Sequence, residues 1–325
     1  MSAAPATIPT SEPAPAVADA VADAPEVLCI GETMAMVTSA DARSLVSAET
    51  FTITQGGAES NLAQHLAELG VRTAWVSALG ADPLGDRVLA TVAASGVDTR
   101  WVRRDPDALT GLYVKDPGAA VYYYRKGSAA SRLGPADVAS WPIRTARWVH
   151  VSGITPALSE SCRALLPAIL DVARANGVGI SFDVNYRPAL WPEDEAAATI
   201  LPLANRADLV LVGRDEAERL WGTPTSEEVA ALFPRPEYVV VKDGAEEAVE
   251  FHRAAGTQTV TRRPARRVEV VEAVGAGDAF GGGYLAALLR GDGPDERLAL
   301  GHSVAAWVLG SPGDFRAGHG TQVRA

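Results

Sequence analysis

The sequence predicts an α/β fold of three layers (α/β/α), in which helices cover both faces of a doubly wound, mostly parallel sheet, with a small β-strand lid added. From residue 147 onward, apolar runs of strand length alternate with stretches of helical periodicity, as in parallel βαβ units. Polar segments follow these strands, and ligands bind such sheets at the carboxyl ends of the strands. Two stretches, 33–55 and 110–125, interrupt the alternation and predict the lid.

The chain has 325 residues, 47% of them hydrophobic, and we expect one domain over residues 26–325. Residues 1–25 are rich in alanine and proline and lack the basic start and apolar core of a signal peptide. We predict that they form a disordered tail.

The formal net charge of -11 argues against nucleic acid or an anionic membrane as a partner, because both are bound through basic patches. No apolar run approaches the roughly 18 residues of a membrane span. Cys29 and Cys162 have apolar neighbours and no metal or disulfide spacing, which fits a reducing, cytoplasmic location. The five histidines show no ligand spacing, so we interpret them as structural or surface residues.

The first half of the chain combines a β-α repeat with strands that cannot easily join a parallel sheet. Its expected elements are a strand at 26–32, exposed antiparallel strands within 33–55, a helix from Gly57 to Gly70, a strand at 72–79, a helix ending at Gly96, and a hairpin of strands 112–114 and 121–124 around Asp116-Pro117-Gly118.

The second half follows the α/β rhythm more closely. Its expected elements are strands at 147–152, 178–183, 208–212 and 238–242, helices at 159–176, 193–205 and 214–221, a buried strand at 268–274, a helix opened by Gly275, and a last helix after Pro294.

Residues 275–278, Gly-Ala-Gly-Asp, form the turn at which that Gly-opened helix begins. The first N–H groups of a helix lack internal acceptors and the dipole is positive there, so the turn is a candidate anion site. Asp278 has two interpretations: a first-turn residue favoured by the dipole, or a base that takes a proton from an incoming hydroxyl. Gly281, Gly282 and Gly283 lie inside the same helix, where each glycine lowers helix stability by about 1 kcal/mol relative to alanine. This cost indicates that another part of the molecule or a ligand approaches the helix closely there. A dinucleotide fingerprint is rejected, because no second strand ending in an acidic residue follows.

A second glycine-opened helix begins at Gly57, and Glu59, Ser60 and Asn61 fall in its first turn. These residues could cap the helix or could point at a ligand. In the hairpin, strand alternation places Tyr122 and Tyr124 on one face, and it places Tyr123 and Arg125 on the other.

The motifs Gly-Ala-Gly-Asp-Ala-Phe at 275–280 and Gly-Gly-Ala-Glu-Ser-Asn at 56–61 resemble the two signatures of the PfkB (ribokinase-like) sugar kinases. Within that family, Tyr-Tyr-Arg-Lys-Gly-Ser-Ala at 123–129, Ser-Gly-Ile-Thr-Pro-Ala-Leu at 152–158 and Asp-Val-Asn-Tyr-Arg-Pro at 183–188 are similar to 2-keto-3-deoxygluconate kinases. The similarity extends from about Glu26 to about Asp314. It implies a ribokinase-like fold.

The resemblance implies a role for each motif. Asp278 would be the base, and the backbone of Gly275, Ala276 and Gly277 would form the anion hole. The sugar would be held by Gly57, Ala58, Glu59, Ser60, Asn61, Tyr113, Tyr123, Tyr124, Arg125, Arg187, Asp278 and Asp314. ATP would contact Asn185, Arg187, Lys242, Gly244, Ala245, Gly275 and Gly277. Mg²⁺ would be held through water by Glu216, and a monovalent cation is a further candidate cofactor.

The two arginines are the discriminating residues of this interpretation. A 2-keto sugar acid carries a carboxylate, which a planar guanidinium recognises in bidentate fashion. A neutral sugar offers nothing comparable. Arg187 in particular is expected to hold the acid end of the substrate.

The function expected from these observations is an ATP-dependent kinase that phosphorylates the terminal hydroxyl of 2-keto-3-deoxygluconate. The alternatives are a neutral-sugar kinase of the fructose or ribose type and a catalytically weak sugar-acid sensor on the same fold. Glu272-Ala273 and Gly213 depart from the family pattern on the nucleotide side, which is why the sensor is retained. A homo-oligomer that pairs through the lid is expected, because the lid edges need cover.

Overall fold

The computed structural model describes residues 24–118, 120–311 and 313–319, and the predicted tail over 1–25 lies almost entirely outside them. A nine-stranded sheet forms the middle of the molecule, with the order β13-β12-β11-β10-β9-β8-β1-β4-β5. Its strands are β1 (Val27–Ile30), β4 (Thr73–Gly80), β5 (Val102–Asp105), β8 (Trp148–Ser152), β9 (Gly179–Asp183), β10 (Leu209–Gly213), β11 (Tyr238–Asp243), β12 (Glu247–Ala254) and β13 (Thr257–Pro264).

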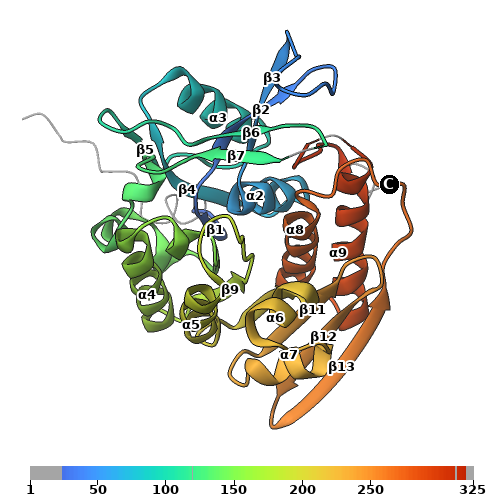
Figure 1. Ribbon diagram of the computed structural model, residues 1–325. Helices are drawn as coiled ribbons and strands as arrows, with labels where there is room; N and C mark the ends of the chain where they lie inside the picture. Colours follow the sequence, from blue (N-terminus) through green and yellow to red (C-terminus); the bar gives the residue numbers. More distant parts are fainter. Residues whose placement is uncertain (1–23, 119, 312, 320–325) are drawn as a thin grey trace, which may run out of the picture.

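Seven neighbouring strands of this sheet, from β11 to β5, pair in parallel, and only β12 and β13 are antiparallel. Helices cover both faces, so the predicted doubly wound α/β/α architecture is confirmed (Figure 1). The helices are α2 (Ala58–Glu68), α3 (Pro83–Ala94), α4 (Glu160–Ala175), α5 (Glu193–Ala204), α6 (Arg214–Trp221), α7 (Ser226–Leu232), α8 (Ala276–Arg290) and α9 (Pro294–Leu309).

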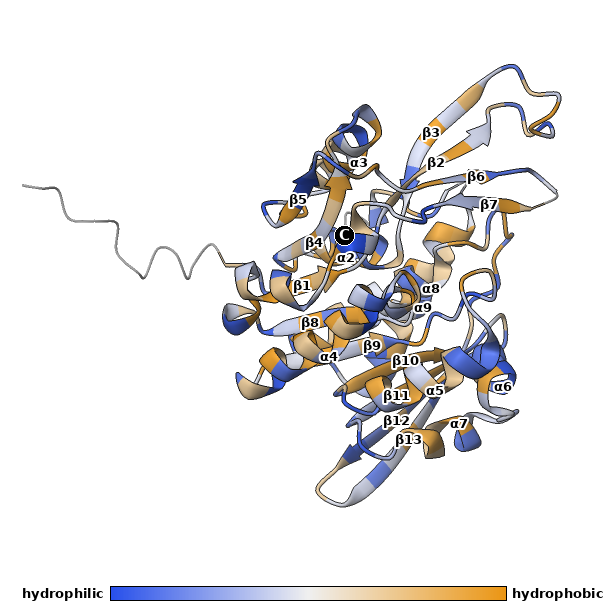
Figure 2. Cartoon of the chain, turned by 60° about the vertical axis from the view of Figure 1, so that its left-hand side comes forward, coloured by the Kyte–Doolittle hydropathy of each residue, from blue (hydrophilic) through white to orange (hydrophobic). Residues whose placement is uncertain are grey.

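Alternation along the strands divides the core into two layers. In β1, Leu28 and Ile30 pack with α4, α5, α6 and α7, whereas Val27 and Cys29 pack with α2, α3, α8 and α9. Because both faces of the strands are covered, the strands read as near-continuous apolar runs. Strand β10, coloured largely orange in Figure 2, is buried along its whole length.

The lid is a second, separate sheet of four strands in the order β3-β2-β6-β7. Its strands are β2 (Met34–Ser39), β3 (Phe51–Gly56), β6 (Leu112–Lys115) and β7 (Val121–Tyr124). The hairpin β6–β7 is antiparallel as predicted, but β2 pairs with β6 in parallel, which joins the two interrupting stretches into one sheet. Figure 1 shows the lid strands at the top of the molecule, above α2.

The three glycines inside α8 allow other elements to approach it closely, as their cost in a helix predicts. A methyl group on Gly282 would lie 2.8 Å from Cβ of His65 on α2, and one on Gly283 would lie 2.8 Å from the carbonyl oxygen of Leu300 on α9. These glycines therefore fix α8 against the two helices beside it.

One predicted element is wrong. Residues 268–274 form no strand, and Val270 and Val271 are 58% and 60% exposed. The segment is a loop held to α9 by the bond from the Val271 N–H to the Leu309 carbonyl. The valines of this loop led to the prediction of a buried strand, because apolar composition alone does not distinguish a core segment from the wall of a cleft. Strands β5, β12 and β13 and helix α7 were not predicted.

Among the described residues, no helix combines the length and apolar character needed to cross a membrane.

Candidate active site

A cleft of about 990 Å³ opens at the carboxyl edge of the main sheet. One wall is formed by the residues that end or follow β9, β10 and β11, and the other by the loop before α8 and the start of that helix. Three of the polar segments that follow strands meet there, since the lining includes Asp183, Asn185, Arg187, Gly213, Glu216, Lys242, Gly244, Ala245 and residues 273–278. The segment 152–155, which follows β8, is not part of this lining.

The turn at 275–278 has the backbone conformation that its glycine allows. Gly275 is the N-cap of α8 with φ of +85°, a left-handed value that is costly for other residues. A methyl group there would lie 2.2 Å from the carbonyl oxygen of Asp314. Gly275, Ala276, Gly277 and Asp278 all line the cleft. The predicted anion turn is thus present, although it follows a loop and not a strand.

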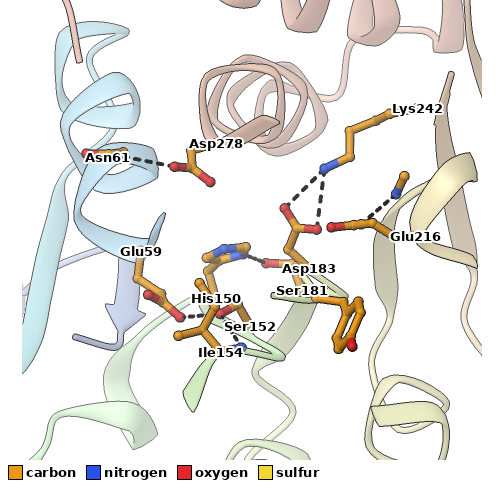
Figure 3. A network of polar contacts seen from close by, with 12 residues as sticks. Glu59, Asn61, His150, Ser152, Ile154, Ser181, Asp183, Glu216, Lys242 and Asp278 are labelled. Atoms are coloured by element: carbon orange, nitrogen blue, oxygen red, sulfur yellow. Dashed lines mark hydrogen bonds and ion pairs between the residues drawn. The ribbon is translucent and has the colours of Figure 1, made fainter. Parts of the chain in front are cut away.

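Asp278 lies at the bottom of this cleft, where it is buried and accepts a hydrogen bond of 2.9 Å from Nδ2 of Asn61 (Figure 3). Burial raises the pKa of Asp278 to about 7, opposed by the Asn61 bond and by the charges of Arg187 and Lys242. A carboxylate with a pKa near neutrality is suited to accept a proton at physiological pH.

Lys242 and Asp183 form a buried ion pair beside Asp278, with Nζ 3.2 Å from Oδ2 (Figure 3). Burial acts to lower the pKa of Lys242, but Asp183 and Glu216 outweigh it and the pKa is raised. The Lys242 ammonium lies close to the turn, because a methyl group on Gly277 would be 3.5 Å from Nζ. A positive charge that faces the anion turn is therefore held in place by a carboxylate.

Glu216, the expected metal contact, lies in the first turn of α6. Its Oε2 accepts a 2.9 Å bond from the N–H of Gly213, and its Oε1 lies 3.6 Å from Arg187. Burial raises the pKa of Glu216, with Lys242 opposing. Within the described parts of the chain no three acidic, histidine or cysteine side chains gather as a ready metal cage. Mg²⁺ commonly takes one or two carboxylates and completes its shell with water and phosphate, so Glu216 fits it.

Asn185 occupies a strained position between these groups. It follows β9 with φ of +39°, is buried, and lines the cleft. Its Oδ1 has no hydrogen-bond partner within the described residues. Strain and an unpaired acceptor together indicate a residue positioned for a ligand.

The side chains in the first turn of α2 bond to residues outside that helix. Gly57 is the N-cap and, as a glycine, supplies no side-chain cap. Asn61 bonds to Asp278, and Oε1 of Glu59 accepts a 2.6 Å bond from Ser152. Ser60 donates only to the carbonyl of Gly57, at 3.0 Å.

Glu59 is buried with one oxygen unused. Burial raises its pKa to about 7, with the Ser152 bond opposing, and Oε2 has no partner in the described part of the chain. Gly57, Ala58, Ser60 and Glu59 are not part of the cleft lining, so this cluster joins the cleft through the Asn61–Asp278 bond.

The lid brings some of its predicted residues to the site and not others. Tyr123 lines the cleft and stacks on Tyr113, with ring centroids 5.9 Å apart. Tyr113 is buried and donates a 2.9 Å bond to Oδ2 of Asp314. Tyr124 is 64% exposed and, by strand alternation, lies on the face opposite Tyr123, so its contact with the sugar stays a prediction.

The Arg125 guanidinium is paired with a carboxylate of the protein. Its Nε donates a 2.7 Å bond to Oε2 of Glu32, and Ser128 donates to the other oxygen of the same buried carboxylate at 2.6 Å. The sequence placed Glu32 directly after the first strand without assigning it a role. Arg187 is different: its side chain is 46% exposed and lies in the cleft lining. Among the described residues it approaches Glu216 at 3.6 Å and donates a bond to the Tyr186 carbonyl. Of the two arginines, Arg187 is the one that offers its fork to a ligand.

Three charged residues of the site region had no assigned role in the sequence: Glu32, Asp183 and Lys115. Lys115 contacts Asp314, and that pair is 199 positions apart in the chain. No local spacing could have found it. Asp183 could have been found, because it ends a strand within a motif already noted.

Comparison with known proteins agrees with this geometry. Residues 24–316 match the model of the pfkB family carbohydrate kinases. The chain is 36% identical over 298 residues to a 2-dehydro-3-deoxygluconokinase of Bacillus subtilis, which covers 89% of this chain and 91% of that protein. It is 33% identical to a 2-dehydro-3-deoxygalactonokinase of Haloferax volcanii, over 89% of this chain and 92% of that protein.

Among solved structures, the crystal structure of a PfkB protein from Polaromonas sp. JS666 superposes with a TM-score of 0.83 at 35% identity, covering 93% of this chain and all of that one. The superposition covers nearly the whole of both chains.

Proposed function

Because the chain belongs to the pfkB family of carbohydrate kinases, we propose that its substrate is 2-keto-3-deoxygluconate, phosphorylated on the terminal hydroxyl with ATP as donor. The observation that carries the proposal is the buried Asp278, with its pKa near 7, at the start of a helix whose first turn lines the cleft. That placement supports the proposal of a base and an anion site side by side.

In the proposed step the sugar hydroxyl oxygen forms a bond to the γ-phosphorus of ATP, and the bond from that phosphorus to the β–γ bridging oxygen breaks. The hydroxyl proton passes to the Asp278 carboxylate, and ADP leaves with the electron pair of the broken bond. Asn61 orients the accepting carboxylate through its 2.9 Å bond.

Charge on the transferring group is met by the protein at two places. Residues 276–278 line the cleft at the start of α8, and the first N–H groups of a helix lack the acceptors that later turns supply. Lys242 lies beside Gly277 and can turn from Asp183 to the phosphates. Asn185, Gly244 and Ala245 line the rest of the proposed nucleotide site. Electrostatic stabilisation of this kind is the main requirement of phosphoryl transfer.

Glu216 is the residue we propose to hold Mg²⁺ through water. The metal would neutralise developing phosphate charge. The chain itself contributes a buried carboxylate whose raised pKa drops when a cation binds nearby.

Recognition of the acid end is assigned to Arg187, since Arg125 is committed to Glu32. Tyr123 would cover the bound sugar from the lid. A second candidate is a neutral-sugar kinase. It is favoured by the pairing of Arg125 with Glu32, because Arg187 alone gives a weaker preference for sugar acids than two arginines would.

A substrate panel on the purified full-length protein tests the proposal. ADP release is measured with ATP and Mg²⁺ against 2-keto-3-deoxygluconate, its galactonate epimer, fructose and ribose. We expect the sugar acids to be preferred. A higher kcat/KM for fructose or ribose would establish the neutral-sugar alternative, and sugar-acid binding without ADP release would establish the sensor.

We also propose that the chain pairs with a second copy through the lid. On β7, Tyr122 and Tyr124 are exposed on one face and Val121 on the other, and β3 exposes Phe51. Apolar residues on an open edge sheet need cover, and a second copy would supply it. Sedimentation of wild type against Tyr124→Ser tests this, because a monomeric wild-type protein contradicts it.

A further inference from the structure

Lys115 ends lid strand β6, and its ammonium group lies between two carboxylates from the other end of the chain. Nζ is 2.9 Å from Oδ1 of Asp314 and 3.5 Å from Oε2 of Glu272. The lysine and Asp314 side chains are largely buried, so water screens their attraction less than that of surface pairs.

Both carboxylates lead directly to the anion turn. The backbone of Asp314 packs on Gly275, where a methyl group would meet the Asp314 carbonyl oxygen at 2.2 Å. Glu272 Oε1 accepts a 3.3 Å bond from the N–H of Val274, the residue before Gly275. Lys115 therefore reaches the turn by two independent routes.

The other end of the same hairpin is held differently. Arg125, just after β7, forms its ion pair with Glu32, two residues after β1, and is linked to the turn less directly, through the rings of Tyr123 and Tyr113. The Asp314 carboxylate is in addition bonded by Tyr113 on β6. Among the described residues, the ion pairs that join the hairpin to the segments beside the turn come from the β6 side.

Lys115 also controls charge. Without it, Asp314 and Glu272 would stand as two unneutralised carboxylates next to a turn that must accept an anion. They would repel each other and the ligand. The same lysine thus holds the lid strand in place and keeps the region beside the turn close to neutral.

We propose that Lys115 is a positioning residue that couples the place of the lid to the conformation of the anion turn at 275–278. It touches neither the sugar nor the reacting atoms. It acts through Asp314 and Glu272, so that the turn is ordered when β6 is seated over the site. The inference goes beyond the proposed function, and only its kinetic test rests on it.

The experiment compares Lys115→Gln with Lys126→Gln in the full-length protein. Lys126 is an exposed lysine of the same lid, so this control makes the same change of charge. Hydrogen exchange of the unliganded proteins is followed at 112–115, at 272–277 and in α4. Lys115→Gln is expected to raise exchange at both 112–115 and 272–277 and to leave α4 unchanged, and Lys126→Gln is expected to change neither.

The kinetic arm measures kcat/KM for ATP at fixed sugar. We expect a fall of about tenfold for Lys115→Gln, within the usual range of coupling between sites, and recovery of most of it in Lys115→Arg. Faster exchange in the lid alone, equal acceleration in α4, or an unchanged kcat/KM for ATP would each overturn the proposal. If no sugar of the panel is phosphorylated by the wild type, the proposed function fails while the exchange data still decide the coupling.

Discussion

Two sides of the site are built on different principles. The α2–lid wall, made of α2 and strands β6 and β7, meets the cleft at Asp278 and Tyr123 and consists of side chains already paired with other side chains, as in the Asn61–Asp278, Ser152–Glu59 and Arg125–Glu32 contacts. The loop wall, residues 265–275, is a stretch of backbone with exposed valines and no regular structure.

This difference indicates how each wall should respond to substitution. A buried, paired side chain supplies its partner's hydrogen bond or counter-charge. Its removal therefore lowers the stability of the protein as well as its activity. A group that lies open in the cleft affects only the ligand it meets. The predictions below use pairs of similar residues, one from each situation.

The largest effect is expected from Asp278→Asn, because the amide cannot accept the hydroxyl proton. Turnover should fall by about 10² to 10⁴, the usual contribution of a general base. Steady-state ADP release measures it. Asp215→Asn, a change at another carboxylate of the same cleft lining, is the control and should keep near-normal turnover. Near wild-type turnover in Asp278→Asn would end the mechanism proposed above.

Arg125→Leu should show that this arginine is structural. It leaves the buried Glu32 carboxylate without its cation, which costs about 3 to 5 kcal/mol of unfolding free energy. Urea unfolding measures the loss, and the double variant Arg125→Leu with Glu32→Leu should recover much of it. A stable single variant that fails only in sugar binding would return Arg125 to the role first predicted for it.

Arg187→Leu is the matched change in the open cleft. We expect almost no loss of stability. For the sugar acid, kcat/KM should fall by an amount equivalent to about 2 kcal/mol, which is the lower end of the cost of removing one partner of a charge pair, because the Arg187 side chain is half exposed. The KM for ATP should change little. Equal losses for a sugar acid and for its neutral analogue would show that Arg187 does not read the carboxylate.

The pH dependence follows from the raised pKa of Asp278, about 7. Since the folded pKa lies above the usual value near 4, the folded state binds the proton more tightly, so this residue's contribution to stability is greatest below pH 4 and is lost as pH rises toward 7. The stability of Asp278→Asn relative to wild type should therefore increase between pH 4 and 7. Activity of the wild type should fall below about pH 7. A flat stability difference across that range would show that Asp278 is not buried as described.

The smallest effect concerns the lid. Sugar acid should protect the amides of β6 and β7 from hydrogen exchange more than those of α4, because Tyr123 of β7 lines the cleft and the residues of α4 do not. Similar protection in both segments would argue that the tyrosines are ordinary packing.

Local pattern was sufficient for most of the fold. Helices and parallel strands were predicted correctly wherever an apolar period extended over a whole element, as in β10 and α4, because that period reflects burial on a defined face. The turn at Gly275 was predicted from the same logic, since a glycine with left-handed φ before a helix has few alternatives. Residues 268–274 failed because valines that line a cleft look like valines of a core.

The sequence by itself therefore determined the layers, the two glycine-opened helices and the residues that could carry chemistry. The tertiary structure alone decided which charges meet: Asn61 with Asp278 across 217 positions, Lys115 with Asp314 across 199, and Arg125 with Glu32 across 93. Such pairs depend on strand order and on how helices cross the sheet. Helical and strand periods act over a few residues, and they contain no information about which distant carboxylate a long, flexible cation will reach.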